Sequence, residues 1–433
     1  MENNTPEKNT TEESVGTFET LGLHPKLLDA LSRLKLTTPT PIQHQAIPLA
    51  TAGNDMIGIA QTGTGKTLAF GLPMLQRLMG TGQQGLVLVP TRELAMQVEE
   101  GLLKVAGPFG LRTVLLIGGA PMFKQKRQLQ GVVNIIVATP GRLIDHLKQR
   151  TLNLSKVSIL VLDEADRMLD MGFEPQIREV MKGVPKERQT LMFSATMPHN
   201  LTDLAHSFMK SPLRIEVARA GTAAEQIEQA FLVLPKEDKI KELRDLLTNF
   251  KETVLVFSRT KHGATKLTRA LNDAGFTAAE IHSDRSLGQR RAALDGFKSG
   301  RFRILVATDI AARGIDVKEI GMVVNFDLPE NAEDYVHRIG RTGRAGHEGV
   351  ALSFATPDQK RDLELIERLI RQELNIHFRV PFDTRGGSGG GGRGRSRGAN
   401  FRRSSSGGFS AGGGSRPSRS PRSGGGGFRG RRR

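Results

Sequence analysis

Short apolar runs alternate with amphipathic stretches along most of this chain. In the first half the runs lie at residues 55–60, 85–90, 113–117, 134–138, 158–162 and 189–193. In the second half they lie at 253–257, 279–282, 303–307, 322–325 and 349–354. Apolar and polar positions do not alternate within the runs, so they predict strands buried on both faces of a parallel sheet, with helices outside. We therefore expect an α/β protein with two similar lobes.

The stretches between the runs predict helices and set the domain boundaries. We expect one capped amphipathic helix over 18–34, and further helices at 43–51, 67–78, 261–274 and 287–298. Periodicity is lost near 215–227. The predicted organisation is therefore a disordered N-terminus (1–15), a first lobe (16–214), a linker (215–227), a second lobe (228–375) and a disordered tail (376–433).

Charge is concentrated in the tail. The chain has a formal net charge of +17, but residues 384–433 contain 13 Arg, no Lys and no acidic residue, which leaves +4 on the first 383 residues. Gly/Ser/Arg repeats with Phe401, Phe409 and Phe428 cannot bury enough apolar surface to fold. Arginine with sparse aromatic residues favours salt-sensitive binding of single-stranded nucleic acid. A solubilising linker is the alternative interpretation.

Composition excludes two classes of site. The chain has no cysteine, so it cannot form disulfides or thiolate zinc sites. The polar N-terminus lacks the apolar segment of a secretory signal, and no apolar run reaches the roughly 18 residues of a membrane span. We expect a soluble, cytoplasmic protein.

The sequence AQTGTGKT at 60–67 follows the first apolar run and precedes a predicted helix. Such a loop directs backbone N–H groups at a phosphate, assisted by the helix N-terminus. Lys66 is expected to reach the β- and γ-phosphates, and the Thr67 hydroxyl to bind Mg²⁺. Ala60 stands where this loop pattern has its first glycine. The rest of the cradle is Gln61, Thr62, Gly63, Thr64 and Gly65. Taken alone, the loop could also be a simple Gly/Thr-rich turn.

Asp163-Glu164-Ala165-Asp166 follows the run at 158–162. A carboxylate at the end of a strand beside a phosphate loop is where Mg²⁺ is expected, so Asp163 is the second candidate metal ligand. Glu164 is placed to orient and deprotonate an attacking water. An acidic helix N-cap would give the same cluster without catalysis.

The second half has no phosphate loop, but it has candidate residues for completing a nucleotide site. Arg341 and Arg344 lie in the segment 337–344, separated by small residues that allow close approach to a ligand, and fixed guanidinium charge stabilises a transferring phosphoryl group. In the segment 313–316, Gly314 lies in a loop after a strand and Asp316 is placed to accept from a ribose hydroxyl. A basic surface loop is the alternative for 337–344.

Nine motifs occur in order: PTPIQ (39–43), AQTGTGKT (60–67), PTREL (90–94), GG (118–119), TPGR (139–142), DEAD (163–166), SAT (194–196), ATDIAARGID (307–316) and HRIGRTGR (337–344). This set resembles the DEAD-box ATP-dependent RNA helicases over about residues 16–375. The opening segment, the absence of cysteine and the Gly/Arg tail look most like bacterial RhlE-type members.

The resemblance implies two RecA-like lobes and assigns roles by position. Gln43 is expected to read adenine, with Phe18 as the upstream aromatic residue near the base. Lys35-Leu36 stands where members often have Gly and an aromatic residue. Ser194 and Thr196 are expected to couple hydrolysis to lobe movement. The implied RNA-backbone contacts are Thr91, Arg92, Gly119, Thr139, Arg142, Arg259, Arg290 and Thr308.

The implied activity is RNA-stimulated hydrolysis of ATP, with Mg²⁺, that locally unwinds RNA duplexes or remodels RNA–protein complexes. Single- and double-stranded RNA are the expected partners, largely independent of sequence, because backbone contacts do not read bases. Ribosomal or RNA-decay assemblies are further candidates, and no membrane is expected. Two alternatives remain open. One is a DNA helicase or remodeller of the same superfamily, and the other is a non-enzymatic RNA chaperone.

Overall fold

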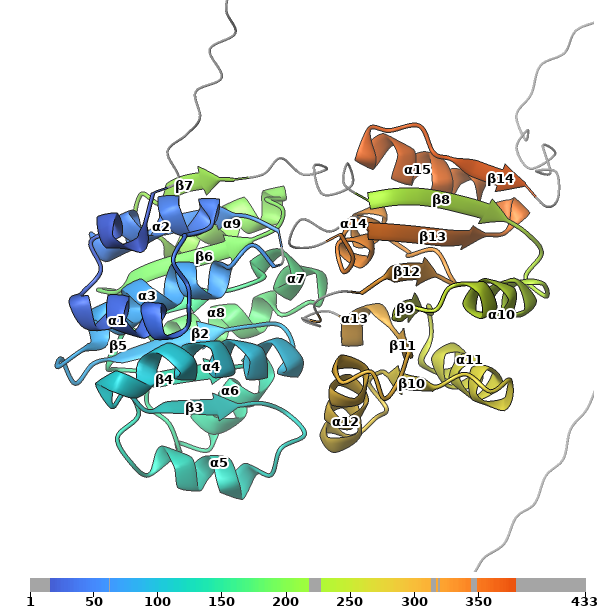
Figure 1. Cartoon of the computed structure of the whole chain (residues 1–433). Helices are drawn as coiled ribbons and strands as arrows, with labels where there is room; N and C mark the ends of the chain where they lie inside the picture. The colour runs from blue at the N-terminus through green and yellow to red at the C-terminus, as the bar shows by residue number, and fades with distance from the viewer. Residues whose placement is uncertain are drawn as a thin grey trace, which may run out of the picture. The chain divides into compact units, whose positions relative to one another are not determined.

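The computed structural model describes residues 16–61, 63–217, 227–312, 317, 320–343 and 349–378, which form two α/β lobes (Figure 1). Each lobe contains a seven-stranded sheet among these residues. Every neighbouring pair of strands in each sheet is parallel. The prediction of two lobes with parallel sheets is confirmed.

The sheet of the first lobe has the order β3-β4-β2-β5-β6-β1-β7. Its strands are β1 (Met56–Ile59), β2 (Gln84–Leu88), β3 (Thr113–Leu116), β4 (Ile135–Ala138), β5 (Val157–Leu162), β6 (Gln189–Ser194) and β7 (Leu213–Glu216). Because all strands are parallel, the segments that follow β2, β3, β4 and β5 lie at one edge of the sheet.

Helices cover both faces of this sheet, and each face has its own apolar core. In β5, Ile159 and Val161 pack into one core while Leu160 and Leu162 pack into the other, as the twofold period of a strand requires. The helices are α1 (Pro25–Arg33), α2 (Pro41–Thr51), α3 (Lys66–Leu78), α4 (Arg92–Ala106), α5 (Met122–Leu129), α6 (Pro140–Lys148), α7 (Ala165–Asp170), α8 (Glu174–Gly183) and α9 (His199–Phe208).

The second lobe also contains a parallel sheet, in which the strand order is β10-β11-β9-β12-β13-β8-β14. Its strands are β8 (Ile227–Val233), β9 (Val254–Phe257), β10 (Ala278–Ile281), β11 (Ile304–Ala307), β12 (Met322–Asn325), β13 (Gly349–Ala355) and β14 (Ile376–Phe378). Its helices are α10 (Lys239–Asn249), α11 (Lys261–Asp273), α12 (Leu287–Lys298), α13 (Asp309–Ala312), α14 (Ala332–Ile339) and α15 (Lys360–Ile370).

The predicted single helix over 18–34 is wrong. The structure has a short 3₁₀ helix, η1 (Phe18–Leu21), and then α1. Gly22 separates them with a φ of 73°, in the left-handed region that glycine adopts without strain. Pro25 then fits the first turn of α1, where its missing N–H is not needed.

Strands β7, β8 and β14 lie outside the predicted runs. Strand β8 begins at Ile227, inside the segment predicted as a linker, and β14 lies beyond residue 375, where the second lobe was expected to end. Both pair in the same sheet, so the second lobe extends to Phe378. The N-terminal segment 1–15, residues 218–226 of the linker, and the tail from residue 379 lie outside the described residues.

Candidate functional site

The loop between β1 and α3 has the geometry of an anion cradle. Gly63 and Gly65 have φ values of 87° and 88°, which strongly favour glycine. Gly65 caps α3 and has no side chain to occupy the amides of the first helical turn, so those of Lys66 and Thr67 remain available to a phosphate. Lys66 is buried, and its Nζ donates to the Ala60 carbonyl at 2.7 Å. Thr64 Oγ1 donates to the Gln61 carbonyl at 2.7 Å.

Alanine is accommodated at position 60 because the backbone there extends the β1 ladder. The Ala60 N–H donates to the Ser194 carbonyl at 2.9 Å, next to the last residue of β1. Extended backbone has no need of glycine. The departure from the loop pattern therefore leaves the left-handed positions at Gly63 and Gly65 unaffected.

Gln43 is placed directly against the phosphate loop. Its Nε2 donates to the Gly65 carbonyl at 2.9 Å, and its Oε1 accepts from the Thr40 N–H at 3.0 Å. A Cβ on residue 65 would come within 2.4 Å of that Nε2, so Gly65 is needed for this contact as well. Phe18 is a core residue with 4% of its surface exposed, and stacking on a base stays a prediction.

Two buried carboxylates follow β5. Burial raises the pKa of Asp163 to about 6, against the opposing effect of Lys66. Glu164 has a left-handed backbone, with φ 52° and ψ 50°, an uncommon conformation for a residue with a side chain. One of its oxygens, Oε2, accepts from Arg167 Nη1 at 3.1 Å, whereas the buried Oε1 has no hydrogen-bond partner among the described residues. A buried acceptor without a partner is a candidate to accept a hydrogen bond from a water or a ligand.

Asp166 joins the end of β5 to the end of β6. Its Oδ2 accepts from the backbone N–H groups of Ala195 and Thr196, at 3.0 and 2.9 Å, and from Thr196 Oγ1 at 3.0 Å. Its own N–H donates to Ser194 Oγ at 3.2 Å. Burial alone would raise the pKa of Asp166, but Arg167 and the Thr196 hydrogen bond contribute to lowering it below the usual value of an aspartate.

Sequence reasoning did not identify Arg167 or the role of Asp166. Arg167 is buried and its guanidinium is the partner of Glu164. An arginine three positions after Glu164 was the available signal, because residues at that spacing lie on the same face if the segment is helical.

The predicted RNA contacts of the first lobe come together at one edge of its sheet. Thr91 and Thr139 cap α4 and α6, with Thr91 Oγ1 accepting from the Leu94 N–H. Arg142 Nη1 donates to the Ala120 carbonyl at 2.9 Å. Gly119 has a φ of 80°, and a Cβ there would come within 2.4 Å of Arg92 Nη1. These residues follow β2, β3 and β4, three adjacent strands.

The second-lobe candidates are more scattered. Arg259 follows β9, and its N–H donates to Asp327 Oδ2 at 3.1 Å. Thr308 follows β11, and its N–H donates to the Ile281 carbonyl at 3.3 Å. Arg290, in the first turn of α12, is buried and its Nη2 donates to Glu93 Oε2 at 2.7 Å. Its part in RNA binding stays a prediction.

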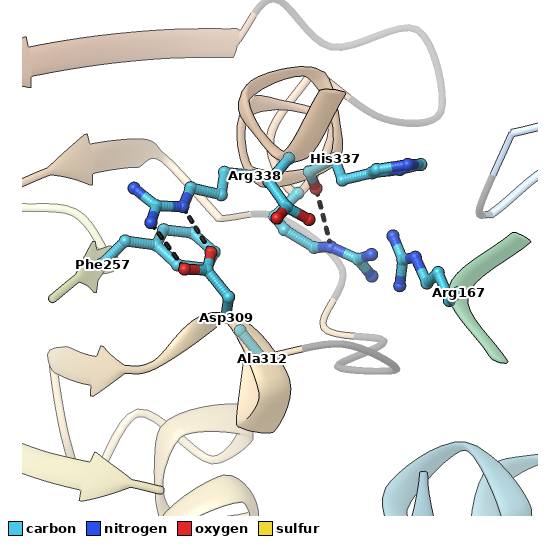
Figure 2. A pocket seen from close by; sticks show the side chains of 8 residues that line it. Arg167, Phe257, Asp309, Ala312, His337 and Arg338 are labelled. Atoms are coloured by element: carbon cyan, nitrogen blue, oxygen red, sulfur yellow. Dashed lines mark hydrogen bonds and ion pairs between the residues drawn. The ribbon is translucent and has the colours of Figure 1, made fainter. Parts of the chain in front are cut away.

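Arg341 follows α14 and lines the pocket in Figure 2 together with Asp334, His337 and Arg338. Its Nε donates to the His337 carbonyl at 3.2 Å. Thr62, Gly314, Asp316 and Arg344, also predicted for the nucleotide site, lie outside the described residues.

Arg338 is the buried anchor of this region, and sequence reasoning missed it. Its Nε and Nη2 donate to the two carboxylate oxygens of Asp309, at 2.5 and 2.7 Å (Figure 2). Its Nη1 donates to Asn325 Oδ1 at 3.1 Å. The guanidinium also lies over the Phe257 ring, 4.9 Å from its centroid. Strands β9 and β12 and helices α13 and α14 are therefore joined through one side chain.

A divalent cation at the first-lobe site would depend on phosphate as well as protein ligands. The described residues contain no cluster of three His, Asp or Glu side chains able to hold a metal ion. Mg²⁺ is commonly bound by one or two carboxylates together with substrate phosphates. Asp163, beside Lys66 and the phosphate loop, fits that pattern. In the same described part of the chain, no helix is long and apolar enough to cross a bilayer.

Known families match most of the two lobes. Residues 40–204 match the model of the DEAD/DEAH box helicases, and residues 238–346 match that of the helicase conserved C-terminal domain. The chain is 44% identical over 360 residues to an ATP-dependent RNA helicase CshA of Listeria monocytogenes, covering 82% of this chain and 69% of that protein. It is 43% identical over 398 residues to DEAD-box ATP-dependent RNA helicase 30 of Arabidopsis thaliana, covering 88% and 67%.

Solved structures agree with these matches. Dbp5 of S. cerevisiae bound to RNA and ADP BeF3 superposes with a TM-score of 0.77 at 32% identity, covering 84% of this chain and 95% of that one. Mss116p bound to ssRNA and AMP-PNP gives a TM-score of 0.78 at 26% identity, covering 87% and 82%. The RecA-like lobe prediction is confirmed.

Proposed function

This chain belongs to the DEAD-box ATP-dependent RNA helicases, and we propose that Glu164, Asp163 and Lys66 form the catalytic centre of its ATPase. The protein hydrolyses ATP and uses the reaction to unwind RNA. What remains to be assigned is the role of each residue in this chain.

The observation that carries the assignment is the free oxygen of Glu164. Arg167 orients the carboxylate through Oε2, and the left-handed backbone fixes its direction, while Oε1 has no hydrogen-bond partner among the described residues. We assign Oε1 to the water that attacks the γ-phosphate. The water would donate to this oxygen, and the carboxylate would take up its proton.

Lys66 and the phosphate loop supply the positive charge and the N–H donors that would bind the phosphates. Lys66 Nζ would exchange the Ala60 carbonyl for oxygens of the β- and γ-phosphates. Mg²⁺ would be held by Asp163 and Thr67, and when bound it would neutralise charge on the phosphates. The raised pKa of Asp163 suits this role, because a cation favours the ionised form that burial alone disfavours.

Hydrogen bonds between Asp166 and residues 194–196 support a coupling role for Ser194 and Thr196. Any shift of the Asp163–Asp166 segment on hydrolysis would act directly on the segment after β6. Gln43 would exchange its present contacts for adenine, and Arg341 and Arg344 would stabilise charge on the γ-phosphate. Gly314 and Asp316 are assigned to the nucleotide as well.

The RNA track is proposed to run over Thr91, Arg92, Gly119, Thr139 and Arg142 in the first lobe, and over Arg259, Arg290 and Thr308 in the second. Support comes from the grouping of the first five at the carboxyl ends of adjacent strands, where ligands of parallel sheets bind. The family relatives solved with RNA add to this support.

Finer assignments remain proposals. The Gly/Arg tail and opening segment favour an RhlE-type member, whereas the bacterial relative reported above is named CshA. Binding of double- as well as single-stranded RNA, a cytoplasmic location, and association with ribosomal or RNA-decay assemblies belong to the same level of proposal.

The test is ATP turnover with single-stranded RNA, single-stranded DNA or neither, in the wild type and Glu164→Gln. Removing a general base costs about 10²–10⁴ in rate, so Glu164→Gln should lose RNA-stimulated turnover while still binding ATP. Glu174→Gln is the matched control, because Glu174 is a half-exposed carboxylate of the same lobe, paired with Arg178. Equal stimulation by DNA would favour the broader helicase superfamily. Absence of turnover with any nucleic acid would favour the chaperone alternative.

A further inference from the structure

A buried polar pair lies beside the Gly118–Gly119 turn, outside every motif of the family pattern above. His146 of α6 is 0% exposed and Gln125 of α5 is 3% exposed. Their side chains meet with His146 Nε2 at 3.1 Å from Gln125 Oε1. Burying two polar side chains is unfavourable unless every donor and acceptor is satisfied, so their partners indicate what the pair does.

The amide nitrogen of Gln125 holds both ends of the turn. Nε2 donates to the Ile117 carbonyl at 2.9 Å and lies 3.5 Å from the Ala120 carbonyl. These carbonyls flank Gly118 and Gly119. Gly119 has a φ of 80°, which favours glycine, and two glycines have no side chains that could fix the position of the turn. Helix α5 packs against β3, the edge strand that leads into this turn (Figure 1).

The other end of the amide is fixed by α6. Because Gln125 Nε2 faces two carbonyl oxygens, Oε1 must be the acceptor toward His146, which therefore donates from Nε2. His146 Nδ1 lies 2.8 Å from Thr151 Oγ1, and the same hydroxyl lies 3.1 Å from the His146 carbonyl, so Thr151 fixes the outer side of the ring. Burial, with Arg142 nearby, lowers the pKa of His146, in keeping with a neutral ring of this tautomer.

Helix α6 also carries Arg142, four residues before His146 and so on the same face. Arg142 Nη1 donates to the Ala120 carbonyl, the carbonyl that Gln125 Nε2 approaches. The turn is thus fixed between the first turn of α6, which presents Thr139 and Arg142, and the Arg92 guanidinium packed against Gly118 and Gly119.

We propose that Gln125 and His146 are positioning residues for RNA binding, which act by holding the Gly118–Gly119 turn in register with Arg142 and Arg92. This inference rests on the proposed RNA track and extends it to two residues that do not touch RNA. The pair sets how tightly RNA binds in the first lobe and leaves ATP binding and the chemical step unchanged.

The decisive variant is Gln125→Glu. A glutamate keeps the acceptor for His146 but turns a carboxylate oxygen toward two carbonyl oxygens, so the turn loses its donor. The RNA concentration for half-maximal ATPase stimulation should rise about tenfold, the effect of leaving one buried polar group unsatisfied. The turnover at saturating RNA and the KM for ATP should stay within about twofold of the wild type.

Gln189→Glu is the matched control. Gln189 is 2% exposed in the same lobe, and its Nε2 donates to two backbone carbonyls, those of Ala50 and Asn54, at 2.7 and 2.8 Å. It begins β6, at the end of the sheet opposite the RNA track. The same chemical change should lower the thermal midpoint comparably but leave half-saturation by RNA unchanged.

A second pair of variants covers a failure of Gln125→Glu to fold. His146→Gln can donate to Gln125 Oε1 and should restore near wild-type RNA dependence, whereas His146→Leu fills the space without a donor and should behave like Gln125→Glu. Equal shifts in RNA half-saturation for Gln125→Glu and Gln189→Glu would overturn the proposal. So would equal behaviour of the two His146 variants.

Hydrogen exchange separates this inference from the proposed function. The amides of Gly118, Gly119 and Ala120 should exchange faster in Gln125→Glu and at the wild-type rate in Gln189→Glu, whether or not RNA is present. If wild-type turnover shows no response to RNA, the proposed function fails and exchange alone decides the role of the pair. Unchanged amide exchange in both variants would refute the proposed role of Gln125 and His146.

Discussion

Lys35 occupies a backbone position that suits glycine. It has a φ of 57° just after α1, where its N–H donates to the Ser32 carbonyl and the Leu36 N–H donates to the Leu31 carbonyl. This pair of bonds is the Schellman ending of a helix, in which the left-handed residue is usually glycine. The backbone at Lys35 therefore agrees with the glycine that the family resemblance leads us to expect at this position.

Replacing Lys35 by Gly should stabilise the first lobe. Relief of left-handed strain is worth about 1–2 kcal/mol and the extra freedom of glycine in the unfolded chain costs about 0.5–1 kcal/mol, so a net gain of about 0.5–1 kcal/mol is expected. Thermal unfolding should shift upward by about 1–3 °C. Ser32→Gly, inside the same helix, is the control and should shift it downward. A lower midpoint for Lys35→Gly would contradict the argument.

Single residues also show where sequence reasoning was limited. The phosphate loop, the two carboxylates after β5 and the residues at the ends of β2, β3 and β4 were all identified, because their motifs are local in sequence. Arg338 and Gln125 were not, because their partners lie far away: Arg338 pairs with Asp309, 29 residues distant, and Gln125 with His146, 21 residues distant. Contacts of this kind depend on which elements become neighbours in the sheet.

At the scale of elements, most strands were predicted, including the edge strands β3 and β10, whereas β7, β8 and β14 were not. Strand β5 is buried along its whole length and reads as a continuous apolar run. Strand β7 exposes three of its four residues, and β14 has only three residues, so neither has a pattern that distinguishes it from a loop. In strand β8, Glu228 and Gln229 follow Ile227, so the first half of the strand has no apolar run, although the strand pairs with β13 and β14. Pairing partners, not local pattern, define these strands.

Helix α14 is attached to the second lobe by the core residues Tyr335 and Ile339 and by the buried Arg338. Arg338→Lys keeps the charge but loses the bidentate contact with Asp309 and the bond to Asn325, because an ammonium group cannot reproduce the planar guanidinium fork. Weakening a buried ion pair of this kind should destabilise the second lobe by about 3 kcal/mol. The second-lobe transition in urea should therefore move to lower concentration.

The control is Arg291→Lys, since Arg291 forms an exposed pair with Asp295 in α12 of the same lobe. Exposed pairs of this kind contribute about 0.3–0.5 kcal/mol, so the urea midpoint should hardly change. ATP turnover should also fall in Arg338→Lys, because Arg341 follows directly from the end of α14. A midpoint equal to that of the control would show that Arg338 is not the anchor.

At the scale of the whole molecule, binding energy for RNA is expected to come from two different sources. The first-lobe track has a fixed geometry, in which Arg92, Arg142 and the Gly118–Gly119 turn are held together by hydrogen bonds and packing. The segment from residue 385 lies outside the described residues and contributes 13 arginines without a single acidic residue. We expect the proposed track to distinguish an RNA backbone by its shape, and the segment to add charge and stacking surface.

Removing residues 385–433 should therefore weaken RNA binding mainly at low salt. Each phosphate that the protein no longer neutralises reduces the slope of log K against log salt by about 0.7 for a single strand, so the truncated protein should show a shallower salt dependence.

Replacing all 13 arginines by lysine keeps the charge but weakens stacking on bases, and it should preserve the slope while lowering affinity at every salt concentration. Fluorescence anisotropy with one RNA oligonucleotide across a salt series measures both quantities. If the plots of log K against log salt were parallel for the truncated and full-length chains, the arginines would not bind phosphates. If the lysine variant matched the wild type throughout, charge alone would account for the contribution of this segment.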